Sequence, residues 1–136
     1  MNRFLFLPLL LLFLSPGLLL ADGCDPSGTQ IEMNQCALED FEKIDAKLNQ
    51  VWKQLLDKEK DNTSYIKKLR AAQRAWIVFR DAEIAAMFAC DEDNPRYCWG
   101  SMYPMLYHIA LGELTEARIK RLQEYLDDGQ NPAVDE

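Results

Sequence analysis

The chain has 136 residues, and its 15 lysines and arginines stand against 22 aspartates and glutamates, so its formal net charge is −7 at pH 7. This acidic balance argues against nucleic acid as a partner, because phosphate binding requires a basic face. It favours a basic protein or a cationic surface instead, although many exported proteins are acidic only because charge keeps them soluble.

The first 23 residues have the pattern of a cleaved signal peptide. Arg3 provides a short positive region, Phe4–Leu14 is apolar, and Ala21-Asp22-Gly23 places small residues before a cut. A membrane anchor is the alternative, but the apolar stretch is short for a span and is interrupted by prolines. We therefore expect a periplasmic or secreted protein whose mature part does not insert into a membrane.

Cys24, at the new N-terminus, raises the question of a lipid anchor. The residues before it lack the leucine and the uncharged residue at −2 that are usual in bacterial lipoprotein signals. Acylation of Cys24 would also leave Cys36, Cys90 and Cys98, an odd set in an exported chain. Lipid anchoring is therefore the disfavoured alternative. The mature part, residues 24–128, is expected to be one helical domain, because roughly 110 residues suffice for a modest core.

Helical periodicity predicts three main helices in the mature part. Thr29 and Glu32 form a capping box at the start of the first helix, which continues without proline or glycine to about Lys60. Residues 61–64 break this helix and supply the next N-cap. The second helix is expected over residues 65–89.

The third helix follows a loop at residues 91–96. Ser101 is the expected N-cap, Pro104 is tolerated in the first turn, and the helix ends near Asp128. Residues 129–136 are expected to be a disordered tail. Because no strand-like alternation occurs and short linkers make successive helices antiparallel neighbours, the predicted fold is all-α, a small antiparallel bundle of three main helices.

Four cysteines in an exported chain predict two disulfides, for which three pairings are possible. The economical pairing joins Cys24 to Cys36 and Cys90 to Cys98, because each bridge then closes a short loop. The sequence does not decide among the pairings. A zinc site is disfavoured because no CxxC occurs and His108 is the only histidine, so we expect no metal and no cofactor.

Arg80 is an unexpected residue within the apolar face of the second helix. That face is formed by Leu69, Ala72, Trp76, Phe79, Ala86 and Met87. A guanidinium keeps its charge when it is buried and therefore needs a partner. Asp45 lies near the middle of the apolar face of the first helix. We predict a network centred on Asp45 and Arg80 that fixes the register of the helices and is completed by Asn49, Gln73 and Glu113.

A catalytic interpretation of these residues would pair Asp45 with Glu83 or Glu113, as the two carboxylates of a glycoside hydrolase. A bundle this small has little room for a cleft, so the structural interpretation is preferred. The chain also lacks a GxSxG motif and a glycine-rich phosphate loop. We therefore predict no catalytic residue and no enzyme.

The segment between Cys90 and Cys98 has the composition most typical of a binding surface. Together with the residue directly after Cys98, it brings together acids, an arginine and aromatic residues, namely Asp91, Glu92, Asp93, Arg96, Tyr97 and Trp99. Arginine and aromatic residues are favoured interface anchors, and a disulfide lowers the cost of ordering a loop on binding. A solvated turn whose acids only maintain solubility explains the same composition equally well.

Three segments, taken together, resemble the LprI-like lysozyme-inhibitor family. They follow an early cysteine and read TxxEMNQCA at residues 29–37, LxxxQRAWxxxRDAE at residues 69–83 and GELTxxR at residues 112–118. The chain departs from the family where members commonly carry a cysteine after RDAE and another before the ELT motif. Those places hold Ile84 and residues 108–111, so a local bridge between Cys90 and Cys98 would replace the usual one.

The resemblance implies an exported bacterial helical protein whose characterised relative inhibits lysozyme. Lysozymes of the animal type are strongly basic, so an acidic inhibitor would gain association rate through electrostatic steering. The expected function is a binding module that inhibits such a cell-wall hydrolase, with Asp91–Trp99 as its contact surface. The alternatives are an envelope structural or stress-related interaction protein without an enzyme target, and a small glycosidase-like enzyme.

Overall fold

A computed structural model describes residues 27–130 of the chain. The predicted signal peptide, Cys24 and most of the predicted tail lie outside this range. The described part contains α1 (Gln30–Lys58), α2 (Thr63–Met87), the short α3 (Arg96–Trp99), a 3-10 turn at Gly100–Met102, and α4 (Tyr103–Asp128). It is therefore all-helical with three long helices, as predicted, and no strand occurs between residues 27 and 130.

The ends of α1 and α2 are set by side-chain caps, because the first amide groups of a helix have no partner within it. Thr29 and Glu32 form the predicted capping box, in which the Thr29 amide donates to Glu32 Oε2 at 2.7 Å. Asn62 caps α2 by accepting a hydrogen bond from the Tyr65 amide at 3.3 Å. The predicted cap at Ser101 is not used, because Gly100–Met102 forms the 3-10 turn and Met102 precedes α4.

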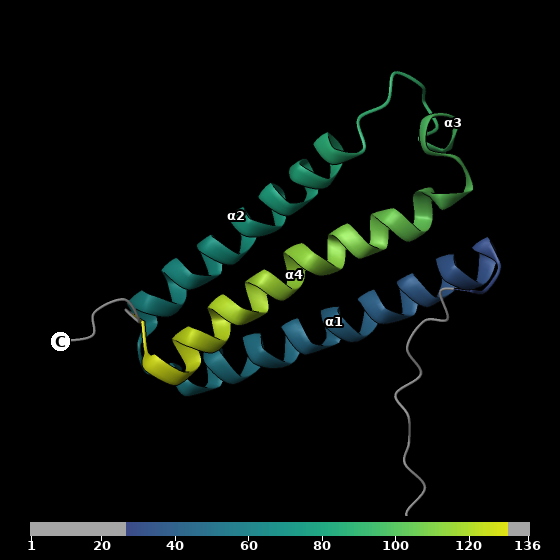
Figure 1. The fold of residues 1–136 in the computed structure, drawn as a ribbon. Helices are drawn as coiled ribbons and strands as arrows, with labels where there is room; N and C mark the ends of the chain where they lie inside the picture. The colour runs from purple at the N-terminus through teal and green to yellow at the C-terminus, as the bar shows by residue number, and fades with distance from the viewer. Residues whose placement is uncertain (1–26, 131–136) are drawn as a thin grey trace, which may run out of the picture.

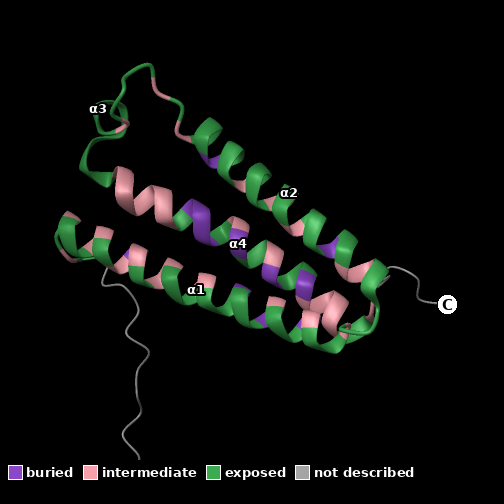
Figure 2. Ribbon diagram, turned by 180° about the vertical axis from the view of Figure 1, so that it is seen from behind, coloured by how far each residue is buried: buried purple, intermediate pink, exposed green. Residues whose placement is uncertain are grey.

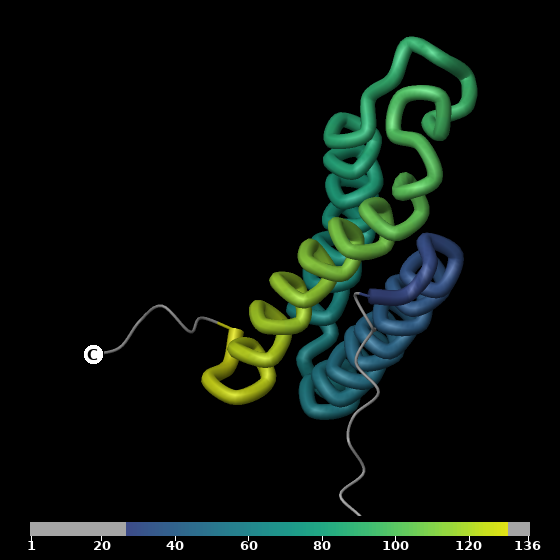
Figure 3. Tube along the Cα trace, turned by 45° about the vertical axis from the view of Figure 1, so that its right-hand side comes forward, coloured from purple at the N-terminus to yellow at the C-terminus, as the bar shows by residue number. Residues whose placement is uncertain are grey.

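Helix α4 lies between α1 and α2 (Figures 1 and 2). It runs in the same direction as α1. Two hydrogen bonds show this, because each joins corresponding ends of the two helices. Asn34 Nδ2 donates to the Ser101 carbonyl at one end, and Lys58 Nζ donates to the Leu126 carbonyl at the other. The close helix pair is thus the parallel pair α1 and α4. Helix α2 is antiparallel to both, and it diverges from α1 beyond their connecting turn (Figure 3).

The buried core follows this arrangement and lies along α4 (Figure 2). Its larger cluster joins α1 to α4 near the turn between α1 and α2, and a smaller cluster lies toward the α3 end. Helix α2 contributes only Leu69 and Ile84 to the buried set. Several of its apolar residues, including Phe79 and Met87 of the predicted apolar face, are exposed. The α1–α4 pair therefore supplies most of the apolar burial.

Gly112 of α4 lies against Ile44 of α1. A Cβ atom placed on Gly112 would lie 3.2 Å from Ile44 Cδ1, which is tighter than ordinary van der Waals contact. The glycine thus allows the two helices to pack closely at this level.

No helix within residues 27–130 combines the length and the apolar character that a membrane span requires.

The contact at Gly112 can be tested with a double-mutant cycle. Glycine to alanine in a helix interior normally adds about 1 kcal/mol of stability, but here the new methyl group would press on Ile44. In an Ile44→Val background, which lacks the Cδ1 atom, we expect Gly112→Ala to be more favourable by about 0.5–1 kcal/mol than in the wild type. Urea denaturation of the four proteins measures the coupling. Strictly additive effects would show that this contact does not limit the approach of the helices.

Candidate functional site

Arg80 has a different partner from the one that the sequence predicts. Its Nε and Nη2 atoms donate to Asp81 Oδ1 at 2.9 and 2.8 Å, while Asp45 accepts a hydrogen bond from Asn49 within α1 at 3.1 Å. The Arg80 side chain is 17% exposed and that of Asp81 is 60% exposed. The predicted Asp45–Arg80 pair does not form, because α1 and α2 diverge and α4 lies between them (Figure 1).

Gln73 of the predicted network does join two helices, but its partner is Arg118, which the prediction did not place in the network. Arg118 Nε of α4 donates to Gln73 Oε1 of α2 at 2.9 Å. The guanidinium carbons of Arg80 and Arg118 lie 5.3 and 5.8 Å from the centre of the Trp76 ring. Cation–π attraction thus holds part of the α2–α4 contact. Glu113 of the predicted network is exposed on α4 and takes no part in this cluster.

The same contact contains polar atoms that are buried without a hydrogen-bond partner in residues 27–130, namely Tyr65 Oη and Arg118 Nη2. Burial raises the pKa of the Tyr65 phenol, and Glu59 acts in the same direction. Burial also lowers the pKa of the Arg118 guanidinium, which nevertheless stays charged near neutral pH. These groups fit a structural role, because their environment penalises charge and no carboxylate is paired with Arg118 in the described chain.

The carboxylate pairs of the glycosidase alternative are not brought into one cleft. Asp45 lies on α1 and Glu83 lies exposed on α2, and these helices diverge. Glu113 lines a groove between α1 and α4, whereas Asp45 does not line it. No group of three or more His, Cys, Asp or Glu side chains in residues 27–130 could hold a metal ion.

The loop between α2 and α4 is closed by the Cys90–Cys98 disulfide, as predicted, with the two Cα atoms 6.1 Å apart. Asn94 shapes the loop, because its carbonyl accepts from the Tyr97 amide at 2.9 Å and its Oδ1 atom accepts from the Arg96 amide at 3.0 Å. Cys36 is also not a free thiol, but Cys24 lies outside the described residues, so the Cys24–Cys36 pairing stays a prediction.

The loop presents its charged residues and Tyr97 to solvent. Asp91, Glu92, Asp93 and Arg96 are all exposed. Tyr97 is 79% exposed, whereas Trp99 is 37% exposed and packs edge-on against Phe88, with the ring centres 5.4 Å apart. Trp99 therefore fixes the loop to the end of α2, and Tyr97 is left free to contact a partner. The whole segment projects from one end of the molecule (Figure 1).

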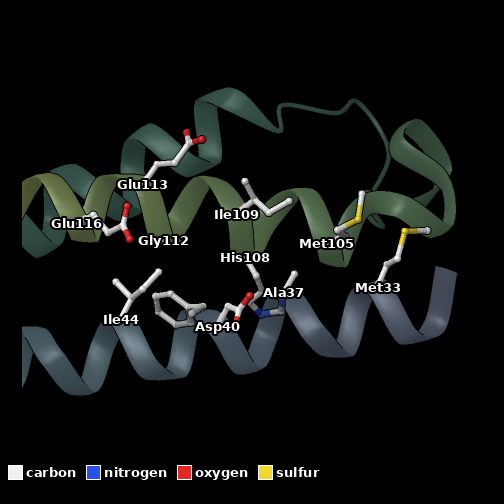
Figure 4. A pocket seen from close by; sticks show the side chains of 11 residues that line it. Met33, Ala37, Asp40, Ile44, Met105, His108, Ile109, Gly112, Glu113 and Glu116 are labelled. Carbon is white, nitrogen blue, oxygen red and sulfur yellow. The ribbon is translucent and has the colours of Figure 1, made fainter. Parts of the chain in front are cut away.

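A groove of about 400 Å³ between α1 and α4 was not predicted from the sequence (Figure 4). Its apolar lining includes Met33, Phe41, Ile44, Met105 and Ile109, and its acidic residues are Asp40, Glu113 and Glu116. The ring of His108, which also lines the groove, stacks on that of Phe41 at 6.1 Å. The part of the sequence that contributes to this groove is Glu113 and Glu116, spaced i and i+3 beside Gly112. That pattern points to a groove only once the packing of α4 against α1 is known.

Residues 21–122 match a family model described as lysozyme inhibitor LprI. An uncharacterized protein of Rhizobium meliloti (strain 1021) is 32% identical over 119 residues, which cover 79% of this chain and 81% of that protein. No solved structure matches the chain.

The buried phenol of Tyr65 leads to a prediction about stability in alkali. Because burial raises its pKa in the folded state, the folded protein keeps this proton at a pH where the unfolded chain, with a phenol pKa near 10.0, has lost it. The stability that Tyr65 contributes is therefore lost as the pH rises through 10. We expect Tyr65→Phe to lose less stability than the wild type between pH 9 and pH 11, measured by thermal melting.

The control is Tyr97→Phe, which changes an exposed phenol. This variant should follow the wild type across the same pH range. At pH 7 Tyr65→Phe should be as stable as the wild type or more stable by up to about 1 kcal/mol, because it removes a buried hydroxyl that has no partner in the described chain. A clear loss of stability at pH 7 would mean that the hydroxyl makes a bond in solution.

Proposed function

Since the chain belongs to the family of the lysozyme inhibitor LprI, we propose that it inhibits a lysozyme by binding it with the loop Asp91–Trp99. The observation that carries this proposal is the exposure of Tyr97 and of every charged residue on a loop that a disulfide closes. The predicted signal peptide would bring the protein to the compartment where cell-wall hydrolases act.

The charge of the loop supports a basic partner. Asp91, Glu92 and Asp93 are consecutive and solvent-exposed, and the chain as a whole carries a net charge of −7. Acidic residues at the tip of an acidic protein accelerate the encounter with a basic protein and disfavour the approach of another acidic one. The partner proposed is therefore a basic lysozyme, and the acids act mainly on the association rate.

The shape of the loop supports inhibition as the outcome of binding. The loop projects from one end of a helical scaffold (Figure 1), so it can enter a concave surface on a partner. The Cys90–Cys98 bridge and the contact between Trp99 and Phe88 order the loop before binding, which reduces the entropy lost in the complex. Tyr97 would then supply the buried aromatic contact, and a loop seated in the substrate cleft would exclude the polysaccharide.

The aromatic contact is tested by Tyr97→Ala in a lysis assay with purified lysozyme and cell-wall substrate. We expect the inhibition constant to rise about tenfold, which corresponds to about 1.4 kcal/mol, because a central aromatic side chain is lost from the interface. Val78→Ala, which removes an exposed apolar side chain from α2, is the control and should inhibit like the wild type. Undiminished lysis at a high molar excess of the wild type would reject inhibition itself.

The role of charge is tested by neutralising the acids of the loop as Asp91→Asn, Glu92→Gln and Asp93→Asn together. The association rate with lysozyme should fall severalfold and depend less on salt, while the dissociation rate changes little. The matched control neutralises Asp57, Asp61 and Asp128, which are exposed at the opposite end of the molecule. Equal effects of the two triple variants would mean that net charge, and not the loop, steers the encounter.

The disulfide is tested by replacing both cysteines of the bridge, Cys90→Ser with Cys98→Ser. Helix content should be retained, because neither residue belongs to a buried core cluster. Inhibition should weaken about three- to tenfold through faster dissociation, because the loop must now be ordered on binding. Circular dichroism and binding kinetics measure the two effects. Unchanged kinetics would show that the contact of Trp99 with Phe88 alone orders the loop.

A further inference from the structure

The groove between α1 and α4 contains apolar side chains that the contact between the two helices leaves exposed. Helices that pack only on each other bury their apolar residues, yet Ile109 is 47% exposed and lies at this groove. Met33 of α1 and Met105 of α4 line one end, and Ile44 and Gly112 line the other (Figure 4). The groove is thus an apolar surface that the described chain leaves open.

The size of the groove and the flexibility of its lining residues suit an apolar side chain of a binding partner. A volume of about 400 Å³ is within the range of sites that bind ligands through their apolar parts. Methionine side chains are unbranched and adapt to guests of different shape, so Met33 and Met105 favour a variable occupant over a single rigid one.

The charged residues that line the groove, Asp40, Glu113 and Glu116, are all acidic. Asp40 is paired with Lys43 at 2.9 Å, and Lys47 and Lys120 line the adjoining hollow, so Glu113 and Glu116 carry the charge that is open to an occupant. Asp40 and Glu116 approach it from opposite helices, and Glu113 lies on its outer side (Figure 4). No lysine or arginine lines it. Glu113 and Glu116 are exposed and form no ion pair with any residue in the range 27–130. A cationic group near an occupant of the groove would therefore be attracted, and an anionic group would be repelled.

We propose that this groove binds a cationic amphipathic peptide. Apolar side chains of the peptide lie on Met33, Phe41 and Ile109, and its lysines or arginines face Glu113 and Glu116. A second copy of this chain is a poorer occupant, because it carries the same charge of −7. The site uses none of the residues of the Asp91–Trp99 loop, so it does not depend on lysozyme inhibition.

The test uses a fluorescein-labelled synthetic peptide of leucines and lysines with helical spacing, titrated with the purified protein while anisotropy is recorded. Glu113→Gln with Glu116→Gln should raise the dissociation constant about three- to tenfold, in line with two exposed charge pairs. Ile109→Gln, which makes the groove polar, should weaken binding by a similar factor. A peptide with serine in place of leucine should not bind.

Matched controls separate the groove from the rest of the surface. Glu39→Gln with Glu42→Gln removes the same charge from exposed positions elsewhere on α1, and Val78→Gln changes an exposed apolar residue of α2. These variants and Tyr97→Ala should bind the peptide like the wild type. Circular dichroism establishes that each variant is folded.

Three outcomes would overturn the proposal. The first is no binding of the leucine–lysine peptide. The second is equal weakening by the groove variants and the control variants, which would indicate attraction by net charge alone. The third is a concentration-dependent dimer in sedimentation that Ile109→Gln abolishes, which would mean that a second copy covers the groove.

Discussion

The packing of α4 against α1 is the constraint on which the rest of this structure depends. The two helices run in the same direction, so the chain must travel back along the whole molecule between them. Helix α2 makes that return, and its 25 residues span about 37 Å at 1.5 Å per residue. Helix α2 contributes only Leu69 and Ile84 to the buried residues. The same geometry places the Cys90–Cys98 loop at the end of the molecule where α1 and α4 begin.

The contact between α2 and α4 shows how a helix with little apolar burial is held in place. Trp76 lies near the guanidinium groups of both Arg80 and Arg118, and Gln73 accepts a hydrogen bond from Arg118. Such polar contacts add little net stability, because the desolvation of charge offsets the attraction. They do depend on direction and distance, and so they favour one register of α2 on α4. The contact thus gives α2 a defined position, and the loop that follows α2 inherits it.

The two candidate binding surfaces are formed by residues that are not buried in the core. The Asp91–Trp99 loop lies beyond the end of α2 and is ordered by its disulfide and by the contact of Trp99 with Phe88. The groove lies where α1 and α4 pack around Gly112 and leave Ile109 partly exposed. Both surfaces contain exposed acidic residues; the groove lies on the α1–α4 pair, and the loop follows α2. The proposed binding of basic partners rests on these acidic residues.

The sequence by itself determined the helices and the caps at Thr29 and in the segment 61–64, because each depends on residues close together in the chain. It also carried the motifs of the family, but it left the pairing of the cysteines open, and the structure supplied the Cys90–Cys98 bridge. The sequence also predicted an exposed acidic loop, whose residues are likewise close together in the chain. Only the tertiary structure decided that α1 pairs with α4, that Arg80 bonds to its neighbour Asp81 and that a groove exists. Periodicity shows which face of a helix is apolar, but not which helix covers it. The partner of each face is selected by contacts between residues far apart in the chain.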